Sequence, residues 1–151
     1  MNETTRLTWH EIAPQGAKAL YGVHHYVTTG TDLPEELIHL ISLRVSQING
    51  CAHCIDLHTR DLLKTMSVDK VVLLPVWAEV PHLFSDQYRA ALAWAEEVTL
   101  VSETHASDEA YAAAAAAFAP KDLVDLMITI AAMNAFNRLG APFRLPVKAQ
   151  A

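Results

Sequence analysis

The chain lacks the features that define several large protein classes. It has only two cysteines in 151 residues, so it is not a disulfide-rich secreted domain. Its longest apolar stretch, residues 111–120, is mostly alanine and too short to span a bilayer. It has no basic run and a formal net charge of −6, so we expect neither nucleic acid nor membrane as a partner. The first residues lack the apolar segment of a secretory signal, and a cytoplasmic location is therefore expected.

Length and composition indicate one domain that spans residues 1–151. Apolar residues make up 52% of the chain, which is enough to form a core at this size. No internal repeat, low-complexity linker or change in composition divides the sequence. Residues 1–15 are predicted to form an irregular arm, because Pro14 and Gly16 interrupt any regular structure there.

Apolar residues recur at helical spacing along most of the remaining chain, and no segment alternates with a period of two. Asp32 and Pro34 are typical of a helix start, and Gly50 is typical of a left-handed helix end. The sequence therefore predicts an all-α fold of about six to eight helices. The expected helices cover residues 17–29, 32–49, 51–66, 67–74 and 86–103, a segment that starts at 108 and includes the alanines at 112–117, and residues 121–139.

The two cysteines are three positions apart, and a histidine follows four positions later: Cys51, Cys54 and His58. On a helix these residues share one face. Because Gly50 precedes Cys51, the cysteines lie at a helix start, where unpaired N–H groups favour a thiolate. His58 is one turn from Cys54 and two turns from Cys51, so it is better placed to accept a proton from Cys54. We therefore predict Cys54 as the nucleophile and Cys51 as the resolving thiol.

Other interpretations of the cysteine pair remain open at this point. A zinc ion bound by the two cysteines and His58, with His53 or His39 as a fourth ligand, is one alternative. We expect no metal, because zinc sites usually draw on a second ligand pair elsewhere in the chain. Haem attachment is excluded, since Ile55 rather than histidine follows the second cysteine. The last alternative is a pair of buried structural cysteines.

Two segments resemble a known family. Residues 43–58 (LRVSQINGCAHCIDLH) resemble the signature of the alkylhydroperoxidase AhpD core family, which shares its fold with carboxymuconolactone decarboxylases. Residues 130–139 (IAAMNAFNRL) look like the second recurring segment of that family. The resemblance extends over residues 20–146. It implies an all-helical AhpD-like fold with the cysteine pair at the N-terminus of a helix.

The resemblance also implies a peroxidase-type activity. In the family the second cysteine attacks the peroxide and becomes a sulfenic acid, and the first cysteine condenses with it to a disulfide. Cys54 and Cys51 match these positions, His58 matches the proton-relay histidine, and His53 matches a histidine between the cysteines. The family usually has a glutamate twelve residues before the first cysteine, where this chain has His39. A histidine also relays protons near neutral pH.

The sequence therefore predicts a thiol-dependent hydroperoxide reductase with Cys54, Cys51, His58, His53 and His39 as its catalytic residues. The resemblance implies no bound cofactor, an external thiol or dithiol as reductant, and assembly into a homotrimer or homohexamer. One alternative is a lactone decarboxylase on the same fold. The other is a non-catalytic metal-binding or redox-sensing module.

Several other polar residues are candidates for structural roles. Asn134, Asn137 and Arg138 share one face of an otherwise apolar helix, and burial requires that they meet polar partners. We expect them to join helices or subunits. His24 and His25 are adjacent, so at most one faces the site, and both are interpreted as surface residues.

Overall fold

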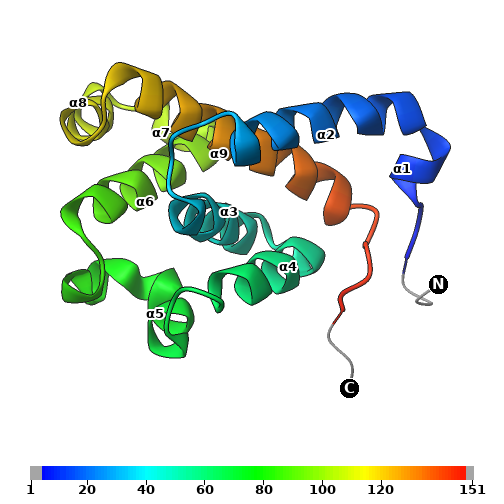
Figure 1. The fold of residues 1–151 in the computed structure, drawn as a ribbon, viewed down its shortest axis with the longest axis horizontal. Coiled ribbons are helices and arrows are strands. Elements are labelled where there is room, and N and C mark those ends of the chain that lie inside the picture. The colour runs from blue at the N-terminus through cyan, green and yellow to red at the C-terminus, as the bar shows by residue number, and fades with distance from the viewer. Residues whose placement is uncertain (1–4, 149–151) are drawn as a thin grey trace.

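The computed structural model describes residues 5–148, and the regular elements in this part of the chain are all helices, without a β-strand (Figure 1). The predicted all-α fold is therefore confirmed. The helices are α1 (Trp9–Ile12), α2 (Pro14–Thr29), α3 (Glu35–Asn49), α4 (Ala52–Leu62), α5 (Val68–Leu73), α6 (Asp86–Thr99), α7 (Val101–Thr104), α8 (Asp108–Ala117) and α9 (Pro120–Gly140), with 3₁₀ helices η1 (Leu74–Glu79) and η2 (Pro81–Leu83) between α5 and α6. The short helix α1 lies in the segment expected to be irregular, and the short helix α7 falls at the end of the segment expected as one helix over 86–103.

The expected irregular arm is wrong for residues 9–15, while its first four residues lie outside the described part. Trp9 is the first residue of α1, and its side chain is only 8% exposed. Its ring stacks on Tyr21 of α2, with centroids 5.9 Å apart, and lies 6.5 Å from the ring of Phe136 on α9. Burial of this large side chain holds the turn in place, and α2 then begins at Pro14, where a proline suits the first helical position.

Three other expected boundaries also differ. Helix α3 starts at Glu35, after Pro34, rather than at Asp32. Helix α4 ends at Leu62 rather than at residue 66. The segment expected as one helix over 86–103 breaks at Leu100, whose backbone leaves helical geometry. Helix ends are set by such local capping contacts, which periodicity does not reveal.

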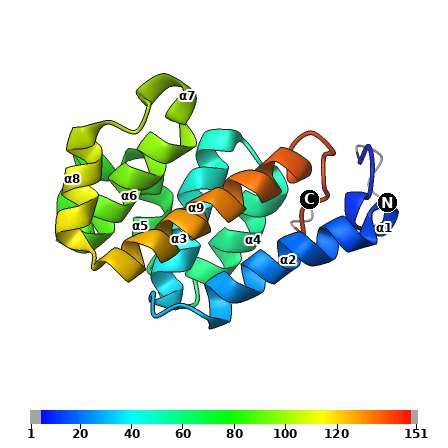
Figure 2. The ribbon, with the colours of Figure 1, turned by 90° about the horizontal axis from the view of Figure 1, so that it is seen from above.

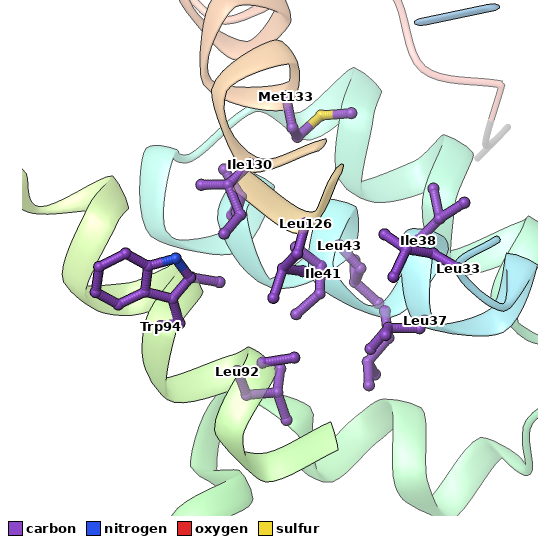
Figure 3. Packing of buried hydrophobic residues seen from close by; sticks show 14 of the residues in the cluster. Leu33, Leu37, Ile38, Ile41, Leu43, Leu92, Trp94, Leu126, Ile130 and Met133 are labelled. Atoms are coloured by element: carbon purple, nitrogen blue, oxygen red, sulfur yellow. The ribbon is translucent and has the colours of Figure 1, made fainter. Parts of the chain in front are cut away.

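Helix α3 is the centre of the fold and packs against α4, α6 and α9 (Figures 1 and 2). Leu37 and Ile41 of α3 are fully buried, in one hydrophobic cluster with Leu92 of α6 and Leu126 and Ile130 of α9 (Figure 3). Each such side chain contributes about 1.5–3 kcal/mol when it leaves water. Because α3 leads directly into the cysteine pair, this core fixes the position of the candidate site.

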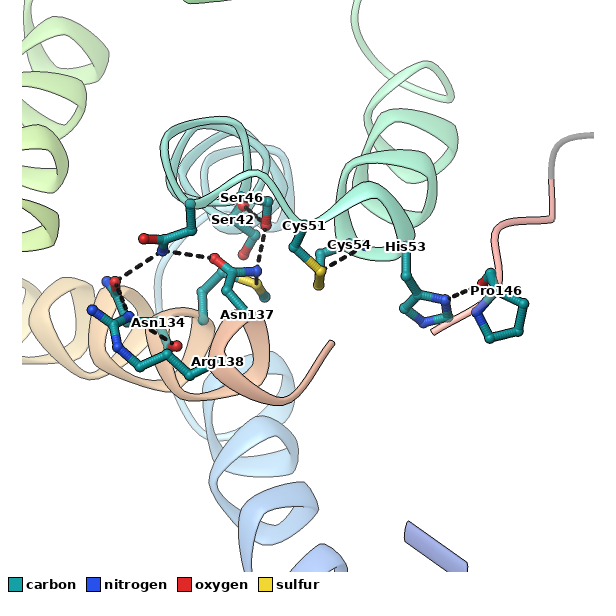
Figure 4. The surroundings of a disulfide bond; sticks show 11 residues. Ser42, Ser46, Cys51, His53, Cys54, Asn134, Asn137, Arg138 and Pro146 are labelled. Atoms are coloured by element: carbon teal, nitrogen blue, oxygen red, sulfur yellow. Dashed lines mark hydrogen bonds between the residues drawn. A yellow bond between two sulfur atoms is a disulfide. The ribbon is translucent and has the colours of Figure 1, made fainter. Parts of the chain in front are cut away.

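The expected polar network is present between α3 and α9. Asn49 Nδ2 donates to Asn134 Oδ1 and to Asn137 Oδ1, both at 3.0 Å. Asn137 Nδ2 in turn donates to Ser46 Oγ at 3.0 Å, and Arg138 donates to Asn134 Oδ1 at 2.9 Å (Figure 4). The network holds α9 to the last turn of α3, beside the cysteines.

No helix between residues 5 and 148 is both long and apolar enough to cross a membrane.

Candidate redox site

Cys51 and Cys54 are joined by a disulfide at the start of α4 (Figure 4). Gly50 ends α3 in the left-handed conformation, with φ at +68°, and so redirects the chain into α4. Cys51 is the residue before the first helical position, and its Sγ accepts a hydrogen bond from Cys54 N at 3.3 Å. The pair therefore lies at a helix N-terminus, where backbone N–H groups stabilise a thiolate once the disulfide is reduced.

The two sulfurs differ in their access to solvent. Cys51 is fully buried, whereas Cys54 is 5% exposed and lines a cavity. A reagent that enters the cavity can therefore reach Cys54 but not Cys51. The sequence left open a zinc site at the two cysteines. In this oxidised state the sulfurs are bonded to each other, so they are not thiolates and cannot bind zinc.

The cavity next to Cys54 has a volume of about 160 Å³. Trp9, Tyr21 and Phe136 form an aromatic part of its wall. Tyr21 is 48% exposed, so the wall extends to the molecular surface. The polar part of the lining includes His24, which was predicted to lie on the surface. His24 is exposed, as predicted, and it also faces the cavity, where its ring meets the ring of Phe136 edge-on at 6.0 Å.

His58 lines the same cavity, one turn of α4 after Cys54, and is only 4% exposed. Burial, together with the nearby His39, lowers the pKa of His58 to about 4. The imidazole is therefore neutral at pH 7. A neutral imidazole beside a thiol can accept its proton.

His39 lies on α3 and faces His58 across the helix interface. The two Nδ1 atoms are 3.4 Å apart. The other ring nitrogen of His39, Nε2, is 3.6 Å from Glu35 Oε1, one turn earlier on α3. The second nearby acid, Glu36, instead bonds to Tyr88. The fold thus brings together a carboxylate and two imidazoles that lead from solvent toward Cys54.

His53 also lines the cavity, but its Nδ1 is hydrogen-bonded to Pro146 O at 2.5 Å (Figure 4). A second contact holds the same segment, because Lys148 N donates to Asp56 Oδ2 at 2.8 Å. Between α9 and these contacts, Leu145 covers one side of the cavity. His53 therefore anchors the C-terminal segment against α4.

Gly140, the last residue of α9, lies against the disulfide. A Cβ at this position would be 2.7 Å from Cys51 Sγ and 3.3 Å from Cys54 Sγ. The first distance is shorter than any ordinary contact, so a larger residue requires the sulfurs to move. In the sequence this glycine was read only as a helix end. Gly140 is 86 residues from Cys54 in the chain, so the sequence did not indicate that the two residues are in contact.

Of the five residues predicted from the sequence, four line the cavity or lie one contact away from it: Cys54, His58 and His53 form part of the wall, and His39 meets His58. Cys51 lies behind Cys54, within the protein. The aromatic wall and Leu145 were not predicted, because long-range packing brings them to the site.

The fold and the site together define an all-helical protein with a CxxC disulfide at a helix N-terminus. The sequence model of the carboxymuconolactone decarboxylase family matches residues 14–97, which is more than half of the chain. The chain therefore belongs to this family.

Two uncharacterized relatives are similar to the chain over most of its length. The chain is 34% identical to the uncharacterized protein YdfG of Bacillus subtilis (strain 168), over 89% of this chain and 90% of YdfG. It is 30% identical to the uncharacterized protein YnjA of Escherichia coli (strain K12), over 72% of this chain and 59% of YnjA.

Solved structures agree on the fold. The protein ATU0492 of Agrobacterium tumefaciens, of unknown function and provisionally assigned as the antioxidant defence protein AhpD, has a TM-score of 0.92 and 35% identity, with 97% of this chain and 99% of ATU0492 covered. The AhpD-like fold is thereby shown. The debrominase Bmp8 has a TM-score of 0.78 at 21% identity, with 92% of this chain and 74% of Bmp8 covered, and shares the fold alone.

Proposed function

We propose that the protein reduces organic hydroperoxides at the Cys51–Cys54 pair. One observation carries the proposal: the two cysteines are bonded to each other, and Cys54, but not Cys51, lines a cavity that also contains His58. This arrangement supports attack by Cys54 and disulfide closure by Cys51, the roles predicted from the sequence.

The reaction begins with the reduced pair. His58 accepts the Cys54 proton, and the thiolate attacks the terminal peroxide oxygen, breaks the O–O bond and becomes a sulfenic acid, while the proton leaves with the alcohol product. The Cys51 thiol then attacks the Cys54 sulfur, which forms the disulfide and releases water. An external dithiol donates two electrons and two protons to restore both thiols and is itself oxidised to a disulfide.

The lining and size of the cavity support an organic rather than a purely inorganic peroxide. A cavity of about 150 Å³ with apolar walls is large enough for one benzene ring. The cavity here is of that size, about 160 Å³, and three aromatic rings form part of its wall. An aryl or compact alkyl group can displace water from it and place a hydroperoxide group beside Cys54.

The proposal is tested by peroxide turnover with dithiothreitol as donor, together with disulfide mapping by mass spectrometry. Cumene hydroperoxide should convert the reduced protein to one Cys51–Cys54 disulfide, and Cys54→Ser should abolish turnover. Exposed His82→Ala is the matched control, since His82 lies on η2 and outside the cavity lining. Two free thiols after peroxide treatment would exclude the proposed chemistry.

A second candidate is reductive dehalogenation of a small aromatic ring. The aromatic wall favours it, and a cysteine-to-alanine variant of the debrominase Bmp8, with which this chain shares its fold at 20% identity, has been crystallised with 2,3,4-tribromopyrrole. In this reaction the dithiol supplies two electrons, the ring gains hydrogen, halide leaves and the disulfide forms. Bromide release from tribromopyrrole that depends on Cys54, without peroxide turnover, would favour this candidate.

The lactone decarboxylase alternative rests on the family relationship. Decarboxylation of a muconolactone that survives in a Cys51→Ser/Cys54→Ser double variant would support it, because acid–base chemistry does not need the thiols.

We also propose that the chain assembles as a homo-oligomer, a trimer or a hexamer. Val68 and Val72 of α5 are 59% and 67% exposed, and Val76 on η1 is 44% exposed. Apolar residues at this spacing form a strip that a partner surface can cover. Sedimentation velocity of the wild type and of Val72→Glu tests this; a monomeric wild type would contradict it.

A further inference from the structure

The fold assembles a second group of potential ligands that was not recognised in the sequence. His39 of α3 meets His58 and Asp61, which are three residues apart on the facing side of α4. One ligand atom of each residue lies within 4.8 Å of the other two. We propose that these three side chains bind a divalent first-row transition-metal ion, such as Zn²⁺ or Co²⁺.

The geometry of the two imidazoles supports this proposal. Their Nδ1 atoms are 3.4 Å apart. Two ligands of a tetrahedral ion with bonds of about 2.0–2.1 Å are separated by about 3.3–3.4 Å. The two nitrogens therefore already have the spacing of adjacent ligands. A ligand atom of Asp61 lies within 4.8 Å of both imidazoles, and its partly exposed side chain would move toward the ion to complete the set.

The surroundings of the imidazoles also suit ligation. A histidine ligand usually donates its other ring N–H to a carboxylate, which fixes the orientation of the ring. Glu35 is available for this role, because its Oε1 lies 3.6 Å from His39 Nε2, within ion-pair distance, and its exposed side chain can move closer to form the hydrogen bond. His58 is buried, so it presents a neutral ring, the form that binds metal.

The charges around Asp61 limit the choice of ion. Lys64 Nζ donates to Asp61 Oδ1 at 2.7 Å, which leaves the second carboxylate oxygen for the ion. Two nitrogens and one oxygen favour zinc, cobalt, nickel or copper over magnesium or calcium, which prefer sets composed entirely of oxygen. The site shares His58 and His39 with the zinc site at the cysteines that the sequence left open, but it uses Asp61 in place of the two thiolates.

Metal binding would have a consequence for the redox site, and this step rests on the proposed function. When Nδ1 of His58 binds an ion, the remaining proton of the ring stays on Nε2. Such an imidazole has no free lone pair with which to accept a proton from Cys54. Zinc should therefore inhibit peroxide turnover, and a chelator should restore it.

Binding is measured first, without any assay of activity. The protein is kept in its disulfide form, so that thiolates do not compete, and is titrated with Co²⁺ while the visible absorption of the bound ion is followed. Zn²⁺ affinity is then measured by competition with a chromophoric chelator. We expect one Co²⁺ per chain, displaced by one Zn²⁺.

Variants distinguish this cluster from the other histidines. His39→Ala and Asp61→Asn should each weaken Zn²⁺ binding more than about 100-fold, since loss of an outer partner alone weakens metal sites about 10–100-fold. Glu35→Gln should weaken it about 10-fold, and exposed His82→Ala should leave it unchanged. Circular dichroism verifies that each variant is folded.

The proposal is overturned if the oxidised wild type binds no Co²⁺, or if His39→Ala and Asp61→Asn bind as the wild type does. Tight binding without inhibition of turnover would support the metal site and would instead remove His58 from the peroxide mechanism. The two proposals therefore fail separately.

Discussion

Gly140 of α9 lies directly against Cys51, although 89 positions separate them in the chain. A Cβ at residue 140 would approach Cys51 Sγ to 2.7 Å, and the fully buried Cys51 has no space into which to withdraw. The absence of a side chain at this point allows α9 to close over the disulfide. The relationship leads to the first prediction.

Gly140→Ala should destabilise the protein by about 1–3 kcal/mol, because the extra methyl group forces the disulfide or α9 to shift. Helix propensity alone would act in the opposite direction, by about 1 kcal/mol. Gly22→Ala is the matched control, since a Cβ at this position of α2 meets nothing within 4 Å. Urea unfolding of both variants measures the difference. A Gly140→Ala protein at least as stable as Gly22→Ala would contradict the close contact.

The unequal burial of the two sulfurs makes a second prediction. Cys51→Ser leaves Cys54 without its partner, so peroxide should produce a sulfenic acid at Cys54 that dimedone traps. Cys54→Ser should give little or no adduct, because Cys51 is fully buried and does not line the cavity. Peptide mass spectrometry locates the adduct. Equal labelling of both variants would mean that access to the cavity does not decide which cysteine reacts.

The third prediction concerns His58. His58→Gln retains a polar side chain opposite His39 but cannot accept a proton from Cys54. We expect peroxide turnover at pH 7 to fall by about 10²- to 10⁴-fold, the usual contribution of general acid–base catalysis. The deficit should narrow at alkaline pH, where Cys54 ionises without help. Turnover measured with a chelator present, across pH 6–10, tests this. A constant deficit at every pH would indicate a structural role for His58.

The sequence predicted the all-α fold and the approximate extents of the long helices, because their apolar residues repeat with helical periodicity. It also placed Cys51, Cys54 and His58 on one face of α4, since spacing within a single helix determines which residues share a face. These features depend on local sequence alone.

The remaining features depend on which helices face each other. Trp9 was placed in an irregular arm because its ring contacts with Tyr21 and Phe136, on two other helices, are not visible in local sequence. Asp61 was overlooked because its relation to His39 exists only across the α3–α4 interface. Spacing along one segment does not contain this information.

The last prediction concerns Asp125 of α9, whose side chain is almost fully buried. Burial on its own would raise the pKa of Asp125, but hydrogen bonds from Lys121 and from Tyr26, the latter at 2.8 Å, outweigh it and lower the pKa below its ordinary value. A carboxyl group with a lowered pKa in the folded state stabilises the protein above its unfolded pKa of about 3.9. That contribution is lost as the pH falls through the folded pKa.

Asp125→Asn should therefore reduce the free energy of unfolding at pH 7 by about 1–2 kcal/mol. This is at the low end of the range for hydrogen bonds to a charged group, because Lys121 is largely exposed to solvent and water screens its charge. The loss should shrink as the pH falls below 4, where the wild type also loses the charged interaction. Asp122→Asn is the control, because Asp122 lies one turn earlier on α9 but is only partly buried. Urea unfolding at pH 7, 5 and 3 measures both. If Asp125→Asn is less stable than the wild type by the same amount at pH 7, 5 and 3, then ionisation of Asp125 does not contribute to the contact between α2 and α9.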